Sequence, residues 1–230
     1  MDNKVTTRIT EREAAIKAWL KELEEVKGAK FPVLPERIYE ALDTINVAIA
    51  IKEFTPDTIE MQDAINENSL EALVFEWYYD GHQMKGVCVE GILFETCLFT
   101  GKPSKTDLLT IPNHEGFEMD PELEVADEDE FYGFCIDPVM NVWYEVLSKE
   151  FDDKSEEYRD LNTTLKNGVD INMIENAYTE LFHLKLVTLL REAHLTAFEK
   201  NPIQITTGKP FHIFIQRHER WPMHVLTLNE

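Results

Sequence analysis

The sequence predicts a single α+β domain over residues 1–230, in which an antiparallel sheet packs against a long central helix and N-terminal helices. Three observations predict this class. Residues 172–198 contain no glycine or proline, helix-start signals recur over about 10–70, and runs of β-forming residues alternate with turn signals in 71–230. The sequence shows no internal repeat and no flexible linker, so the helical portion and the sheet are expected to share one domain.

The central helix is predicted at 172–198. One face of its first half is apolar, formed by Ile174, Ala177, Tyr178, Leu181 and Leu184. The opposite face of that half is polar, formed by Asn176, Thr179, Glu180 and His183. From Leu186 onward the apolar stripe turns by roughly a third of the circumference. Because its polar side changes midway, we expect this helix to lie across the sheet with other helices against it.

Helix-start signals mark the N-terminal portion. Residues Thr10 to Glu13 form a capping-box pattern, an apolar stripe follows it, and Gly28 stands at the stop position. Pro35 fits the first turn of a second helix, and Thr55-Pro56-Asp57 is the start signal of a third. This portion is therefore expected to be mostly helical.

Strand signals begin after residue 71. A turn signal at Asp80-Gly81 and a glycine at Gly91 separate three runs that predict an antiparallel meander, at 72–79, 84–90 and 92–100. The segment 101–130 contains three prolines, many acids and no convincing period, which predicts a long loop. Further strands are predicted at 131–136, 141–147, 211–216 and 223–228.

The charge is strongly acidic: 44 acidic and 22 basic residues give a net charge of −22. Residues 118–160 hold 16 acidic and three basic residues, so the segment carries −13 of that charge. Such a field repels nucleic acid and anionic membranes, and we expect no direct binding to either. It attracts a basic partner protein. The alternative is that the acidity serves only to keep the protein soluble.

The C-terminal hairpin concentrates potential chemistry. Its histidines, His212, His218 and His224, together with Glu219, are ligand types for zinc and other divalent metals. Their spacing matches no metal-binding motif, and His218-Glu219 alone is a weak signal. The favoured interpretation is a charged turn, or a partner contact with Trp221 and neighbouring arginines as anchors.

Other motifs carry no cofactor or catalytic residue. The cysteines, Cys88, Cys97 and Cys135, have no CxxC spacing and lie among apolar residues, so they are interpreted as buried reduced thiols. The N-terminus lacks the apolar core of a signal peptide, and no apolar stretch approaches a membrane-spanning length. We therefore expect a cytoplasmic protein, and the sequence gives no oligomeric state.

These observations favour a non-enzymatic binding protein: an acidic inhibitor, of the immunity or phage anti-defence kind, that docks on a basic surface of a partner protein. The residues expected to steer or anchor the complex are Glu122, Glu124, Asp127, Glu128, Asp129, Glu130, Phe131, Tyr132, Trp143 and Trp221. The first alternative is a small metal-dependent hydrolase or phosphoesterase that uses the C-terminal histidines. The second is a structural subunit in which the acidity has no further role.

Overall fold

The computed structural model describes residues 2–27, 40, 58–77, 88–126, 132–135, 171–200, 202–218 and 220–229. Its helices are α1 (Asp2–Lys27), α4 (Thr58–Asn68) and α7 (Ile171–Lys200). Its strands are β1 (Ala72–Trp77), β2 (Cys88–Leu98), β3 (Glu122–Val125), β4 (Tyr132–Cys135), β5 (Phe211–Arg217) and β6 (Met223–Leu228). The chain has the α+β class that its sequence predicts. The predictions of a helix from Pro35 and of a strand at 141–147 lie outside the described residues.

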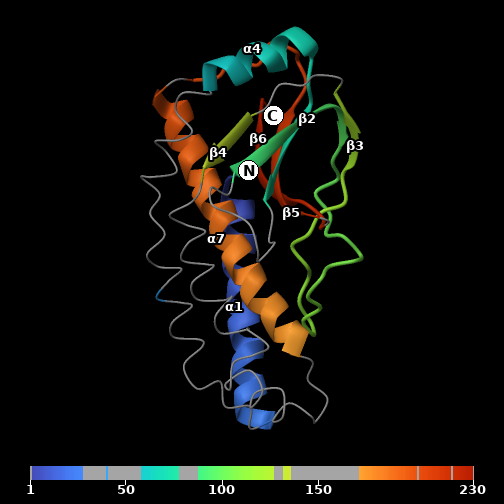
Figure 1. Cartoon of the computed structure of the whole chain (residues 1–230), viewed down its shortest axis with the longest axis vertical. Coiled ribbons are helices and arrows are strands. Elements are labelled where there is room, and N and C mark those ends of the chain that lie inside the picture. Colours follow the sequence, from blue (N-terminus) through green and yellow to red (C-terminus); the bar gives the residue numbers. More distant parts are fainter. Residues whose placement is uncertain are drawn as a thin grey trace.

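Two long helices lie beside one sheet. Figure 1 shows α1 and α7 running along the long axis of the molecule, with the strands in the upper half and α4 across the top. The α7 helix confirms the prediction at 172–198, and it contacts both α1 and the sheet through β6. Among the described helices, none is both long enough and apolar enough to cross a membrane.

The sheet is mixed, with the order β3-β2-β1-β5-β6. The prediction of an antiparallel sheet is correct for most neighbouring pairs but wrong for β1 and β5, which run parallel. A parallel pair requires a long crossover connection, and the chain between β1 and β5 includes α7. The hairpin of β5 and β6 confirms the predicted strands at 211–216 and 223–228.

The β2 strand differs from the predicted meander. The runs predicted at 84–90 and 92–100 meet in one strand, of which residues 88–98 are described, and Gly91 does not end it. Gly91 stands opposite Phe75 on one side and Tyr132 on the other, so neighbouring strands flank it on both sides. The same outer edge of β2 pairs with β4 over its first part and with β3 over its second. The β3 strand thus lies inside the predicted loop 101–130.

The α1 helix begins eight residues before the predicted capping box, at Asp2. Thr10 therefore lies inside the helix, where its hydroxyl donates a hydrogen bond of 3.0 Å to the carbonyl oxygen of Thr6. Glu13 forms an ion pair with Lys17 one turn later, and it lies too far from the first turn to cap the helix. The capping-box prediction is wrong because the same residue types also satisfy a helix interior. The start signal at Thr55-Pro56-Asp57 is confirmed, since α4 begins at Thr58.

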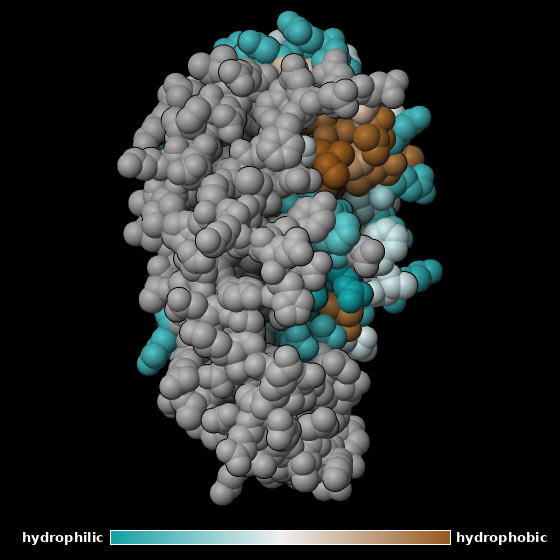
Figure 2. Space-filling model, in the orientation of Figure 1, coloured by the Kyte–Doolittle hydropathy of each residue, from teal (hydrophilic) through white to brown (hydrophobic). Residues whose placement is uncertain are grey.

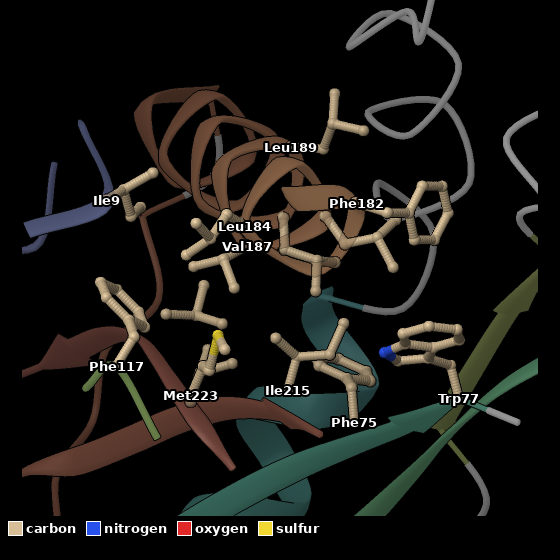
Figure 3. Packing of buried hydrophobic residues seen from close by; sticks show 14 of the residues in the cluster. Ile9, Phe75, Trp77, Phe117, Phe182, Leu184, Val187, Leu189, Ile215 and Met223 are labelled. Carbon is tan, nitrogen blue, oxygen red and sulfur yellow. The ribbon is translucent and has the colours of Figure 1, made fainter. Parts of the chain in front are cut away.

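The main hydrophobic core lies between α7 and one face of the sheet. Alternate residues of β1, Leu73, Phe75 and Trp77, belong to this core, whereas Ala72 and Val74 belong to a smaller cluster with Phe94 and Phe214. Figure 3 shows Phe182, Leu184 and Val187 of α7 near the core residues of the sheet. The buried positions of α7 continue past Leu186 to Leu190 and Ala193. This agrees with a helix that contacts different neighbours along its length.

Candidate functional site

The acidic residues that the sequence predicts as a docking surface are partly described. Glu122 and Glu124 lie on β3, and both side chains are exposed. The β3 strand pairs with β2, and within the described part of the chain no strand pairs with its outer edge. Tyr132 begins β4, but its side chain is not described. Asp127, Glu128, Asp129, Glu130, Phe131 and Trp143 lie outside the described residues.

Two large apolar side chains are exposed next to these acids. Val125, the last residue of β3, is 61% exposed, and Leu98, the last residue of β2, is 64% exposed. Leu98 is the register partner of Glu122 across the β2–β3 pair. Figure 2 shows an apolar area on the side of the molecule where β3 lies, with hydrophilic residues around it. Leu98 shares a face of the sheet with Glu122 and Glu124, whereas Val125 alternates to the other face. We call these four residues, which flank the open edge on both faces, the β3 edge surface.

Trp221 lies close in the fold to the segment that leads into β3. It is 40% exposed and precedes Pro222, whose carbonyl oxygen accepts a hydrogen bond of 2.8 Å from the backbone nitrogen of Met119. Met119 stands three residues before Glu122, and three residues of extended chain span at most about 10 Å. This hydrogen bond joins the hairpin turn that carries Trp221 to the segment that leads into β3.

The three histidines of the hairpin fall into two separate groups. His212 and His224 each form a hydrogen bond of 2.9 Å with the hydroxyl of Thr227. His218 instead contacts Glu76 of β1, with 2.6 Å between its Nδ1 and Glu76 Oε1. Among the described residues, no group of three histidine, cysteine or acidic side chains is placed to hold a metal ion. The geometry thus does not supply the convergent histidines on which the hydrolase alternative depends.

A buried polar cluster joins α1 to α7, and the sequence does not reveal it. The guanidinium of Arg12, which is 1% exposed, donates through Nε and Nη2 to the two carboxylate oxygens of Glu180. Nη2 also donates to the backbone oxygen of Leu109 at 2.5 Å. On sequence, Glu180 and His183 belong to the polar face of the central helix. Both are buried, because Arg12 of α1 packs against Glu180 and Trp77 of β1 packs against His183. A polar residue on a helix gives no signal that another segment will bury it.

Two carboxyl groups of this cluster have raised pKa values. Burial, together with the charges of Asp107 and Glu180, raises the pKa of Glu118 to about 8. Burial also raises the pKa of Glu180, while the hydrogen bond and charge of Arg12 oppose that rise. Glu118, Glu180 and His183 line a cavity of about 20 Å³, which has room for about one water molecule. The cavity cannot hold an organic substrate, so the cluster is a structural link between the helices.

Asp107 approaches the backbone of this loop closely. A methyl group added at Gly116 would overlap its carboxylate, so a larger residue at this position would displace the Asp107 side chain. Asp107 also lies 3.8 Å from the guanidinium of Arg12, which connects the loop to the buried cluster. The loop 101–121 is therefore held by polar contacts at its centre and by a bridge between Pro103 and Met119 at its ends.

The described residues thus offer one exposed surface with the predicted acidic character, at the β3 edge, and a separate buried polar cluster. Neither brings together a nucleophile, a general base and room for a substrate. No family model matches the chain, and the comparisons with curated proteins and with solved structures found no match.

Proposed function

We propose that the protein is an inhibitor that binds a basic partner protein at the β3 edge surface and covers part of that partner. The observation that carries this proposal is the combination at β3 of an open strand edge, exposed carboxylates and exposed apolar side chains. Glu122 and Glu124 supply the charge, and Leu98 and Val125 supply the apolar area. The finer proposal is that the partner is a toxin or a defence protein, as for immunity proteins and phage inhibitors.

The edge of β3 supplies backbone hydrogen-bonding groups. A strand at the edge of a sheet leaves one row of N–H and C=O groups unpaired, and a partner segment can add to it as a further strand. Glu122 and Glu124 oppose pairing between two copies of the chain, because their like charges would meet across the new pair. A partner strand with lysine or arginine at the matching positions would remove that repulsion.

The charge of the whole chain selects the same kind of partner. A net charge of −22 attracts basic surfaces at long range and raises the rate of encounter with them. Burial of exposed apolar side chains then slows dissociation. Leu98 and Val125 are each more than half exposed, and Trp221 offers an aromatic anchor of the type that dominates interface energies. The charge thus favours a basic partner, and the apolar residues prolong the lifetime of the complex.

Comparative enrichment tests this proposal. The wild-type chain and the double variant Glu122→Lys/Glu124→Lys are used to capture proteins from extracts of the source organism at low and high salt. The matched control is Asp63→Lys/Glu67→Lys, which makes the same change of charge at exposed positions of α4. We expect a basic protein to be captured by the wild type and the control, released by salt, and lost with the β3 variant. Equal capture by all three chains, or no basic protein with any of them, would contradict the proposal.

A further inference from the structure

A pocket of about 400 Å³ lies where α1 meets the C-terminal hairpin, and its charge is opposite to that of the chain as a whole. Its charged and titratable lining consists of Lys4 and Arg8 from α1, Arg191 from α7, His212 from β5 and His224 from β6. None of the described residues that line it is acidic, although the chain has twice as many acidic as basic residues. Three cations around one cavity are therefore not explained by composition.

Both guanidinium groups of the pocket are held in place. Arg191 is buried, and its Nη1 donates a hydrogen bond of 2.7 Å to the carbonyl oxygen of Val225. Arg8 is half-buried: its Nη2 donates to the carbonyl oxygen of Gly116 at 3.2 Å, and its guanidinium lies 5.2 Å from the centre of the Phe117 ring. These contacts orient the two guanidinium groups beside the cavity, while the charges of Glu115, Asp107 and Glu11 act on Arg8 from outside its lining.

The third cation lies at the rim of the pocket. Lys4 is in the first turn of α1, and its side chain is exposed. A lysine at such a position can reach an anion in the pocket without a change of fold. The cations thus comprise two oriented arginines and one exposed lysine, a set that suits a phosphate or carboxylate group.

The pKa values of the two histidines of the pocket are lowered. Burial, together with the charges of His212, Arg191 and Arg8, lowers the pKa of His224 to about 3. Burial also lowers the pKa of His212, an effect that Glu71 opposes. A threonine hydroxyl has one proton to donate, so Thr227 can donate to one ring and accept from the other. The positive potential acting on His224 is a second sign that cations dominate this cavity.

An aromatic wall adjoins the cations. The ring of Phe99 lies 5.1 Å from that of His212 and 4.7 Å from that of His224, between ring centres. Val5 and Leu226 extend the apolar part of the lining. The volume of the pocket is within the range of sites that bury small organic ligands and far exceeds the space of one water molecule. A ligand that fills it has both an anionic and a carbon-containing part.

We propose that this pocket binds a small organic dianion, either a phosphate monoester or a dicarboxylate. Lys4, Arg8 and Arg191 bind its anionic groups, and Phe99, Val5 and Leu226 contact its carbon skeleton. A dianion presents anionic oxygens to more of these three cationic groups than a single carboxylate can. The site is distinct from the β3 edge surface, and its occupation does not depend on the inhibitor function.

Calorimetric titration of the full chain tests this proposal. The probes are ribose 5-phosphate, succinate, inorganic phosphate and, as the uncharged control, ribose. We expect saturable binding at one site per chain for ribose 5-phosphate or succinate, weaker binding of inorganic phosphate, and none of ribose. The stronger of the two organic probes identifies the anionic group. Absence of saturable binding for both, or binding of ribose as strong as that of ribose 5-phosphate, would overturn the proposal.

Two lysine variants locate the site. Lys4→Glu reverses a charge at the rim and is expected to weaken binding by about 10-fold, as reversal of a partly screened contact does. Lys21→Glu makes the same change at an exposed lysine of α1, about 20 Å along the helix from Arg8, and it should alter affinity less than about 2-fold. Equal weakening by the two variants would show a general effect of charge and would overturn the assignment to this pocket.

Discussion

The indole nitrogen of Trp77 donates a hydrogen bond of 2.9 Å to Nδ1 of His183, which joins the end of β1 to α7 inside the core. The nitrogen that accepts this bond carries no proton, so the imidazole is neutral with its proton on Nε2. Both side chains are buried, and burial lowers the pKa of His183 to about 3. Proton uptake by His183 would therefore break a polar contact between sheet and helix.

This contact predicts a loss of stability in mild acid. An unfolded histidine titrates near pH 6.5, so below that pH the unfolded chain binds a proton that the folded chain does not bind until about pH 3. The free energy of unfolding should fall by about 2 kcal/mol for this group between about pH 7 and about pH 5. Urea unfolding at the two pH values should show a smaller fall for His183→Gln, whose amide oxygen still accepts from Trp77. An equal fall in both proteins would show that His183 contributes nothing.

The buried pair of Arg12 and Glu180 predicts a large effect of a single substitution on α1. Arg12→Met leaves the Glu180 carboxylate buried without its partner, which should cost about 3–5 kcal/mol of unfolding free energy. Lys17→Met, on the same helix, removes a lysine from an exposed pair with Glu13 and should cost less than about 0.5 kcal/mol. Chemical unfolding measures both values. Similar costs for the two variants would contradict the structural importance of the buried pair.

The raised pKa of Glu118 predicts that stability falls as pH rises, whereas the lowered pKa of His183 predicts that stability rises with pH. Because its folded pKa of about 8 lies above its unfolded value near 4.5, the folded chain retains a proton that the unfolded chain loses. This contribution to stability is fully present below about pH 4.5 and is lost as pH rises toward about 8. Thermal unfolding between about pH 6.5 and about pH 8.5 should show a shallower decline for Glu118→Gln than for the wild type. Glu115→Gln, at a neighbouring exposed position, should retain the wild-type slope.

The sequence predicts where the helices and strands lie better than it predicts which of them pair. The glycine- and proline-free stretch of α7 and the β5–β6 hairpin have local periodic signals, and both are confirmed. The parallel pairing of β1 with β5 is not encoded locally, because a strand sequence does not state which neighbour it meets or in which direction. The pocket could not be predicted for the same reason. Only the fold brings together its lining residues Lys4 and Arg8 with Arg191 and His224, which lie far from them in the sequence. Exposure of Glu122 and Glu124, in contrast, follows from their charge.

The register of β2 and β4 predicts a disulfide under oxidation. Cys88 and Cys135 are directly opposite in an antiparallel pair, where Cα atoms lie about 4.5–5.5 Å apart, within the range of disulfides. We expect both to be thiols in reducing conditions, as the sequence predicts, and diamide to oxidise them to one disulfide while it is reduced to the hydrazine. Cys97 should remain a thiol, since it is buried and burial, with the charge of Glu71, raises its pKa to about 12.

Peptide mass spectrometry after alkylation measures this outcome. The peptides of Cys88 and Cys135 should appear linked, with the loss of two hydrogens, and that link should be absent from Cys88→Ser. A disulfide that includes Cys97, or no link at any diamide concentration that leaves the chain folded, would contradict the observed register.

Hydrogen exchange of the β3 amides, with and without the captured partner, tests the inhibitor proposal most directly. Addition of a partner strand should slow exchange of the amides of β3, while the amides of α4 exchange at an unchanged rate. Protection at β3 that is lost with Glu122→Lys/Glu124→Lys is the predicted result. Unchanged exchange at β3 in a complex that demonstrably forms would contradict the proposal that the protein binds its partner there.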